Sequence, residues 1–287
     1  MTSLVSILAE VRPNEVYNLA AQSHVQDSFY RPQSALLTNT IGVVNLLEAI
    51  RANNLSETVR VYQASTSEMY GDVVTSPQDE RTPFNPASPY GISKLASHLM
   101  CGVYREAYKM YICCGILFNH ESPRRGEDFV TRKITCGVAA IKLGQQTCLK
   151  IGNLDAERDW GFAPEYVDGM WRMMQQKHPQ DFVLATNKSA TVREFVTLAF
   201  EVVGIALHFE GKGLDERGYY LTSNNTKKFV VKVDPSFFRA KEVNALKGNA
   251  QLAHAQLNWT SKTSLRSLCE KMVKADLQRL NLRSMQG

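Results

Sequence analysis

The chain has 287 residues, of which 44% are hydrophobic and 21% charged, a composition typical of one large or two modest globular domains. No apolar run approaches the ~18 residues that a membrane span needs, and no basic segment opens the N-terminus, so we expect no membrane partner. The formal net charge of +5 comes from scattered basic residues, which favours a mildly basic surface, or a pocket for a polyanionic small molecule, over a nucleic-acid partner.

The first part of the chain alternates strand and helix patterns. Apolar or β-rich runs at 15–19, 60–65 and 111–118 predict strands, and helical periodicity predicts helices at 34–53 and from Pro89 to about Tyr108. The connection 72–89 contains four of the ten prolines and must be a loop. This alternation predicts an α/β fold with a Rossmann-like, doubly wound parallel sheet.

The pattern loosens into mixed α and β beyond Asn119. Helices are predicted at 129–143, 166–176, 191–203 and 264–280. We therefore predict a Rossmann-like domain at 1–150 and a smaller mixed α/β domain at 151–287, with the two interleaving.

Six cysteines are present, and none forms a C-x-x-C pair. Three of them lie in apolar runs typical of a protein core. We expect reduced thiols, no metal site and a cytoplasmic protein.

Small and polar residues follow each predicted strand, at 19–23, 65–71 and 118–126. Ligands of open parallel sheets bind at these strand ends. Between the second and third lies Tyr90-Gly-Ile-Ser-Lys94, which places a phenol and an ammonium one turn apart on a helix. Such a pair alone is usually an exposed helix pair. Here the pair lies between polar strand ends, which favours a functional role. We therefore expect the ammonium of Lys94 to lower the pKa of Tyr90 and make Tyr90 a usable base.

Longer motifs carry a resemblance to a known family. They are residues 17–25 (YNLAAQSHV), 63–71 (QASTSEMYG), 88–94 (SPYGISK), 115–126 (GILFNHESPRRG), 129–133 (FVTRK) and 152–161 (GNLDAERDWG). With these motifs the chain resembles the extended short-chain dehydrogenase/reductases, and within them it is most similar to the GDP-mannose 4,6-dehydratases, nearly end to end. The resemblance implies NADP as cofactor and GDP-mannose as substrate, with GDP-4-keto-6-deoxymannose as product.

The resemblance also implies catalytic roles for four residues. By it, Tyr90 takes the proton of the 4-hydroxyl while NADP accepts the hydride from C4, and Lys94 holds the cofactor ribose. Glu68 removes the C5 proton, which the new ketone makes acidic, and helps the 6-hydroxyl to leave as water. Thr66 hydrogen-bonds the sugar near O4 and polarises the developing ketone.

Two positions distinguish this family from its neighbours. Epimerases of the same fold usually have a small apolar residue in place of Glu68, because they catalyse no elimination. An alternative interpretation of Glu68 is a structural glutamate that pairs with a surface lysine. Dehydratases of dTDP-glucose commonly have an aspartate where this chain has Ser67, which favours GDP-mannose.

Binding residues follow from the same resemblance, and a homodimer or homotetramer is implied by the Arg124-Arg125 loop. An alternative for Arg158 and Arg239 is a surface ion pair. The residues implied for NADP are Leu19, Ala20, Ala21, Gln22, Ser23, Lys94, His120 and Arg125, and those implied for the GDP-sugar are Asn119, Lys133, Arg158, Arg239 and Glu242.

The sequence departs from the family pattern in one large respect. It contains no G-x-x-G-x-x-G turn to hold a cofactor pyrophosphate, and the glycine cluster at 211–218 has the wrong spacing. We expect that the first β-α units of the family sheet are missing from it. Smaller departures are Ser34-Ala35-Leu36 in place of the family's Tyr-Thr-Ala, and Ala240 in place of a proline. Alternative functions are therefore a non-catalytic, dehydratase-like interaction protein, or another extended short-chain dehydrogenase acting on a nucleotide sugar.

Overall fold

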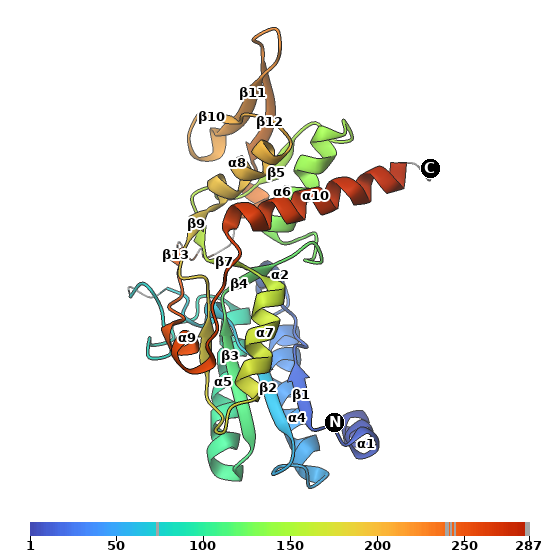
Figure 1. The fold of residues 1–287 in the computed structure, drawn as a ribbon, viewed down its shortest axis with the longest axis vertical. Helices are drawn as coiled ribbons and strands as arrows, with labels where there is room; N and C mark the ends of the chain where they lie inside the picture. Colours follow the sequence, from blue (N-terminus) through green and yellow to red (C-terminus); the bar gives the residue numbers. More distant parts are fainter. Residues whose placement is uncertain (73–74, 239–240, 242, 244, 285–287) are drawn as a thin grey trace.

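The structure is a computed structural model that describes residues 1–72, 75–238, 241, 243 and 245–284 (Figure 1). Its central sheet is parallel throughout and has the order β1-β2-β3-β8, with β1 at Glu15–Asn18, β2 at Arg60–Ala64, β3 at Tyr111–Leu117 and β8 at Phe182–Leu184. The α/β class, the parallel sheet and the first three strands are confirmed.

Helices cover both faces of this sheet. Alternate side chains of a strand point to opposite faces, so Val61 and Ile112 pack with α4 (Gly42–Ala52) and α5 (Pro89–Tyr108), whereas Tyr62 and Cys113 pack with α7 (Ala163–Met174). Both faces of the strands are therefore buried, as the continuous apolar run of β3 predicts.

The second core lies around α6 (Val130–Lys142), α8 (Val192–Val202) and α10 (Leu265–Ser284). These helices pack beside a sheet of order β10-β11-β12-β5, whose outer hairpin forms one end of the elongated molecule (Figure 1). Its strands are His208–Glu210, Arg217–Leu221, Lys227–Val233 and Leu149–Ile151. The predicted division of the chain at residue 150 stays a prediction.

Short elements connect the two cores. Two small sheets have the orders β4-β7 and β13-β6-β9. Their strands are β4 Asn119–Glu121, β7 Trp160–Phe162, β13 Ala245–Leu246, β6 Glu157–Arg158 and β9 Ala190–Thr191. The remaining described helices are α1 Thr2–Val11, α2 Val25–Tyr30, α3 Pro32–Leu36, the π-helical turn Leu37–Ile41 and α9 Gln251–Leu257. The 3-10 turns are Ser67–Met69, Gly213–Asp215 and Pro235–Phe237. None of the helices described is both long and apolar enough to cross a membrane.

The start of α5 is fixed against the end of β2 by three local features. The Ser88 hydroxyl accepts a hydrogen bond from the Gly91 amide at 3.0 Å, and Pro89 occupies the first helical position. A Cβ on Gly91 would lie 2.7 Å from the carbonyl oxygen of Glu68. Only glycine permits this close approach, which brings the first turn of α5 onto the segment that follows β2.

Candidate active site

A cavity of about 420 Å³ opens at the carboxyl ends of the parallel strands, where the sequence predicts a ligand site. Its walls come from the segments after β1, β2 and β3 and from α5 and α7. The predicted site residues among those that line it are Leu19, Ala21, Ser23, Thr66, Glu68, Tyr90, Lys94, Asn119, His120 and Arg125. The structure therefore brings the four predicted catalytic residues to one cavity.

Thr66 organises the catalytic end of β2. Its hydroxyl accepts a hydrogen bond from the Glu68 amide at 3.3 Å and caps the short 3-10 turn that carries Glu68. The side chains of Thr66 and Tyr90 are also hydrogen-bonded to each other. A hydroxyl, a phenol and a carboxylate thus lie together, which is the combination that proton transfers on neighbouring carbons require.

The expected effect of Lys94 on Tyr90 is wrong for this state of the chain. Burial of the phenol raises the pKa of Tyr90 to about 12, and the lowering effects come from the hydrogen bond with Thr66 and from the charge of Arg125, not from Lys94. Lys94 is itself buried, which lowers its pKa to about 8, and its ammonium donates to the Ala64 carbonyl. The spacing of Tyr90 and Lys94 shows that they share a helix face, but it does not reveal that both are buried.

The segment after β1 is held by a buried asparagine that the sequence analysis missed. Asn39 lies in the π-helical turn, accepts from the Gln22 amide at 2.8 Å and donates to the Gln22 carbonyl at 3.0 Å and to Ser93 Oγ at 2.9 Å. A polar residue within the apolar helix pattern of 34–53 is the signal that could have identified it. Leu19, Ala21 and Ser23 line the cavity, whereas Ala20 and Gln22 do not.

His120 and Arg125 form the wall beyond β3. The ring of His120 stacks on Tyr166 with centroids 5.0 Å apart, and its Nδ1 lies 2.9 Å from the Phe118 carbonyl oxygen. Burial lowers the pKa of His120, so its imidazole is neutral near pH 7. The guanidinium of Arg125 lies 3.7 Å from the centre of the Phe129 ring, and its Nε is 3.4 Å from Glu121 Oε2.

A second, smaller cavity of about 150 Å³ adjoins the first and shares Asn119 and Arg125 with it. Lys133 and Arg158 also line it, so three of the predicted GDP-sugar residues meet there. Burial lowers the pKa of Lys133, whose ammonium lies 3.4 Å from the centre of the Phe237 ring. Arg158 is only 6% exposed, which disfavours the alternative of a surface ion pair. Arg239 and Glu242 lie outside the described residues.

Aromatic side chains of the second cavity were not predicted. Phe129 and Phe237 both line it, and each carries a cation over its ring. Flat aromatic faces beside cations suit a ligand that combines a planar base with phosphates. Phe129 opens the motif 129–133, but no role was predicted for its ring, and no motif included Phe237.

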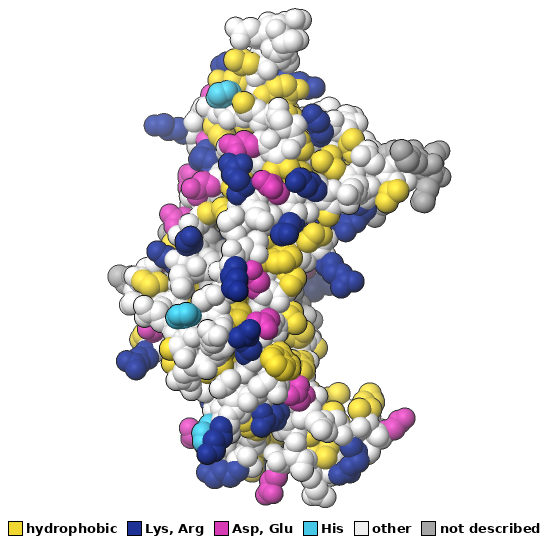
Figure 2. All heavy atoms as spheres, viewed as in Figure 1, with side chains coloured by type: hydrophobic (Ala, Val, Ile, Leu, Met, Phe, Trp, Pro, Cys, Tyr) yellow, Lys and Arg dark blue, Asp and Glu magenta, His cyan; other side chains and the backbone are white. Residues whose placement is uncertain are grey.

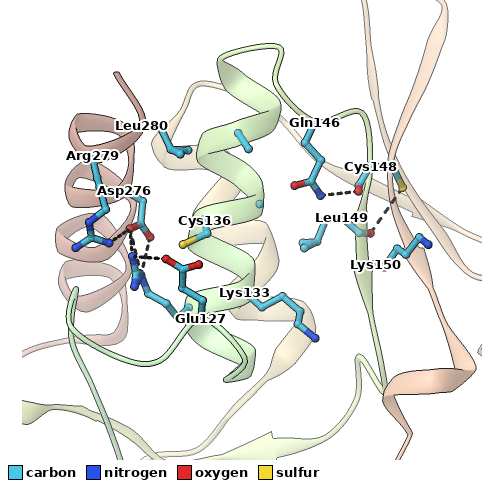
Figure 3. A pocket seen from close by; sticks show the side chains of 13 residues that line it. Glu127, Lys133, Cys136, Gln146, Cys148, Leu149, Lys150, Asp276, Arg279 and Leu280 are labelled. Carbon is cyan, nitrogen blue, oxygen red and sulfur yellow. Dashed lines mark hydrogen bonds and ion pairs between the residues drawn. The ribbon is translucent and has the colours of Figure 1, made fainter. Parts of the chain in front are cut away.

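Another cavity, of about 430 Å³, lies between α6, α10 and β5 (Figure 3). Arg132 pairs there with the buried Asp276, with Nη2 and Oδ1 2.6 Å apart. Lys133 lines both this cavity and the second one. The charges of Arg132 and Asp276 neutralise each other. We therefore interpret the pair as a contact that holds α6 against α10, not as a ligand site.

Fold and site together define the class of the protein. A parallel sheet with helices on both faces, and a Tyr-x-x-x-Lys pair beside a strand-end threonine, are features of the extended short-chain dehydrogenase/reductases. Solved structures agree on the fold: RMD from Pseudomonas aeruginosa, complexed with NADPH, has a TM-score of 0.79 at 21% identity over 93% of this chain and 82% of that one. UDP-glucose 4-epimerase from Thermotoga maritima has a TM-score of 0.78 at 23% identity, over 98% and 82%.

The sequence comparisons identify the family. A family model described as GDP-mannose 4,6 dehydratase matches residues 1–272. The GDP-mannose 4,6-dehydratase of Sinorhizobium fredii is 52% identical over 97% of this chain and 79% of its own length, and that of Yersinia enterocolitica is 48% identical over 96% and 76%. The Drosophila melanogaster enzyme is 48% identical over 96% of this chain and 69% of its own length. The chain belongs to the GDP-mannose 4,6-dehydratase family, a family of lyases.

Proposed function

We propose that this site dehydrates GDP-mannose to GDP-4-keto-6-deoxymannose with NADP as a recycled cofactor. The observation that supports it most is that Glu68, Thr66 and Tyr90 line one cavity at the strand ends of a parallel sheet. An epimerase or a simple dehydrogenase has no use for the carboxylate. Among solved structures of the same fold, several are described as complexes with NADPH or NAD.

The residues of the cavity fit a nicotinamide cofactor. Leu19 is 56% exposed although it lines a cavity, so it offers an apolar surface to a ring, and Tyr90 and Lys94 of α5 line the same cavity. We assign Leu19, Ala21, Ser23, His120 and Arg125 to the cofactor with Lys94, and Ala20 only through its backbone. The backbone of Gln22 is bonded to Asn39, so we assign Gln22 to holding this segment in place. When bound, the oxidised nicotinamide supplies the hydride acceptor, and its positive charge favours the phenolate of Tyr90.

Side chains of the protein carry out the proton transfers. Tyr90 takes the proton of the 4-hydroxyl, and the hydroxyl of Thr66 donates to the oxygen that becomes the 4-ketone. Glu68 takes the C5 proton, which the ketone makes acidic, and delivers a proton to the departing 6-hydroxyl. Tyr90 then gives its proton to C5, while the hydride held by the cofactor would be returned to C6, so the product has lost one molecule of water and no net oxidation remains.

The second cavity is proposed to bind the GDP part of the substrate. Lys133 and Arg158 supply charge for the diphosphate and Asn119 a hydrogen bond near the sugar, and the family resemblance adds Arg239 and Glu242.

The test is Glu68→Gln, which keeps the shape of the side chain but removes the base, and it is made in an extended chain to which a G-x-x-G-x-x-G β-α unit has been joined so that NADP binds. With saturating NADP, the variant is expected to accumulate NADPH absorbance without decay and to incorporate no solvent deuterium at C5. Tyr90→Phe is the contrasting variant and is expected to show no NADPH signal. If Glu68→Gln formed product within about tenfold of the parent rate, a change below ~1.4 kcal/mol, Glu68 would not be the base.

The non-catalytic alternative gives a different result in the same assay. A protein of that kind would bind GDP-mannose in a separate titration but, even in the extended chain that binds NADP, would form neither NADPH nor product with Glu68 intact. This alternative arises because the 287 residues contain no G-x-x-G-x-x-G turn.

We also propose a homodimer. The side chains of Leu37, Ile41, Ile92, Leu99 and Val103 are each about half exposed, and they form an apolar stripe along α5 and the π-helical turn that packs beside it. Apolar side chains in a continuous stripe on a helix pair indicate a protein interface. The cytoplasmic location stays a prediction from cysteine usage.

A further inference from the structure

The helix α5 presents three polar side chains, one turn apart, to the segment that leaves β2. Residues four apart lie on one helix face. The three contacts are Tyr90 with the hydroxyl of Thr66, Lys94 with the carbonyl of Ala64, and His98 with the hydroxyl of Ser65. The proposed function uses the first two of these side chains and leaves His98 without a role.

His98 contacts the strand end in the interior of the protein. Its Nδ1 lies 3.0 Å from Ser65 Oγ, and both residues are buried. The amide of Ser65 donates to the carbonyl of Gly115 on β3 at 2.9 Å. Ser65 is therefore the last residue that the sheet holds before Thr66.

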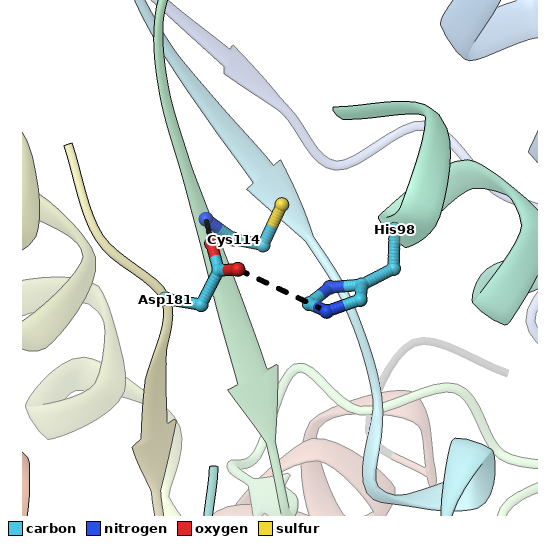
Figure 4. A group of neighbouring side chains, drawn as sticks. All are labelled: His98, Cys114 and Asp181. Atoms are coloured by element: carbon cyan, nitrogen blue, oxygen red, sulfur yellow. Dashed lines mark hydrogen bonds and ion pairs between the residues drawn. The ribbon is translucent and has the colours of Figure 1, made fainter. Parts of the chain in front are cut away.

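The other side of the imidazole faces a fixed negative charge (Figure 4). His98 Nε2 lies 3.9 Å from Asp181 Oδ2. Asp181 is held in place by the guanidinium of Arg105 and by the amide of Cys114, whose nitrogen is 2.9 Å from Oδ1. A carboxylate at this position favours the tautomer with the proton on Nε2. Nδ1 is then an acceptor, and the Ser65 hydroxyl donates to it.

We propose that His98 is a positioning residue of the dehydratase site. By fixing the hydroxyl of Ser65, it holds the backbone that places Thr66 against Tyr90. The inference rests on the proposed function and adds to it a residue outside the reacting groups. Arg105 holds Asp181 in place, and the carboxylate of Asp181 favours the His98 tautomer that accepts from Ser65.

A cation site is the competing explanation for the same group. Ligand atoms of His98, Cys114 and Asp181 all lie within 4.8 Å of one another. However, Asp181 already accepts from both terminal nitrogens of Arg105 and from the Cys114 amide. A second cation next to this guanidinium would be repelled. The described contacts therefore favour a hydrogen-bonded chain over a metal centre.

The first experiment measures turnover of four histidine variants, made in the same extended chain that binds NADP. His98→Phe keeps a ring against Phe84, whose centroid lies 5.4 Å away, but has no acceptor. We expect its kcat to fall about tenfold, with the KM for GDP-mannose within about twofold. His98→Asn places an amide oxygen near the position of Nδ1 and is expected to recover most of this loss, whereas His98→Gln reaches the position of Nε2 and is not. His208→Phe, at an exposed histidine, is the matched control.

The second measurement asks whether His98 acts through Ser65. If it does, Ser65→Ala and the double variant Ser65→Ala/His98→Phe have nearly the same kcat, because the contact is already lost in the single variant. The proposal would be overturned if the fold-losses in kcat of the two single variants multiplied in the double variant, or if His98→Phe left kcat unchanged. His98→Gln replaces His98→Phe in this comparison if the latter does not fold.

A third readout does not need turnover. Hydrogen exchange of the Ser65 amide, followed by NMR, reports whether the strand end is still held to Gly115. His98→Phe and His98→Gln are expected to exchange this proton at least about tenfold faster than the parent chain, and His208→Phe at the parent rate. An extended parent chain that binds NADP but is inactive would contradict the proposed function alone. Equal exchange rates in all variants would contradict the positioning role.

Discussion

At the scale of single residues, burial decides the chemistry of the site. The sequence indicates which of its ionisable groups come together, because Tyr90 and Lys94 are one helical turn apart and Glu68 follows a strand. It does not indicate that the phenol and the ammonium are both desolvated, and this reverses the expected pKa of Tyr90. Contacts over long sequence separations, such as Gln22 with Asn39, are equally invisible to local patterns.

We expect the burial of the charged Lys94 side chain to lower the free energy of unfolding. Its pKa in the folded chain, about 8, lies below the ordinary lysine value of 10.5, so the unfolded chain binds the extra proton between these pH values. The free energy of unfolding therefore rises with pH across this window, and the cost is fully present below pH 8. We expect Lys94→Met to be more stable than the parent at pH 7 by up to about 3 kcal/mol, and inactive.

Urea unfolding of the parent and of Lys94→Met at neutral pH and near pH 10.5 measures this difference. The advantage of the variant is expected to shrink at the higher pH, where Lys94 is neutral in the parent. An advantage that is the same at both values, or a variant that is less stable at neutral pH, would show that the burial of Lys94 is not costly.

Arg158 is expected to contribute to binding of the GDP-sugar. It lines the second cavity and is almost fully buried, so its charge is not fully screened by water. Arg158→Ala should weaken GDP-mannose binding by about 1.5–3 kcal/mol, the range for hydrogen bonds to charged groups. Isothermal titration of the variant measures it, with Arg266→Ala, at an exposed ion pair with Glu201, as control. An unchanged dissociation constant would place the diphosphate elsewhere.

At the scale of elements, the sequence predicts the parts whose periodicity is strong. The helix α5 begins and ends at the expected residues, and β1, β2 and β3 are shorter than predicted by one residue each. The hairpin of β11 and β12 was missed because its strands mix exposed lysines with aromatic residues and one glycine. The helix α1 was missed too, since it has no side-chain cap, no acidic residue in its first turn and no basic residue in its last turn.

The apolar stripe along α5 leads to a prediction about assembly. Leu99→Asp and Val103→Asp each place a charge in the middle of the proposed dimer interface, where its desolvation would be costly. We expect these variants to be monomers by analytical ultracentrifugation, and the parent to be a dimer. Leu214→Asp, at an equally exposed leucine far along the chain in a 3-10 turn, is the control. A monomeric parent, or variants that remain dimers, would remove the stripe as an interface.

At the scale of the whole molecule, the two cores serve different parts of the proposed ligands. The parallel sheet presents the catalytic groups at its strand ends, and the elements around α6 and β6 present the cations of the second cavity. On the face shown in Figure 2, basic and acidic side chains alternate, and no large field of one sign covers it. The positive charge that we assign to a phosphorylated ligand lies in the second cavity, at Lys133 and Arg158.

The same organisation predicts unequal affinity for the two ligands. Among the described strands, β1 pairs with β2 on one side only, and Tyr17 and Leu19 beside it are 38% and 56% exposed. The 287-residue sequence supplies no glycine-rich turn with a helix N-terminus for a cofactor pyrophosphate. It does supply buried cations for a GDP-sugar. We therefore expect the 287-residue polypeptide to bind GDP-mannose clearly and NADP weakly or not at all.

Separate titrations of this polypeptide with NADP and GDP-mannose, by calorimetry, test the prediction, and light scattering shows whether the open edge of β1 causes aggregation. Arg158→Ala is the matched control, because it should weaken only the GDP-mannose titration. Sub-micromolar binding of NADP by a soluble, non-aggregated chain would contradict the prediction. The pyrophosphate would then have to be held by groups already described, and Arg125 and the backbone of 19–23 would be the first to examine.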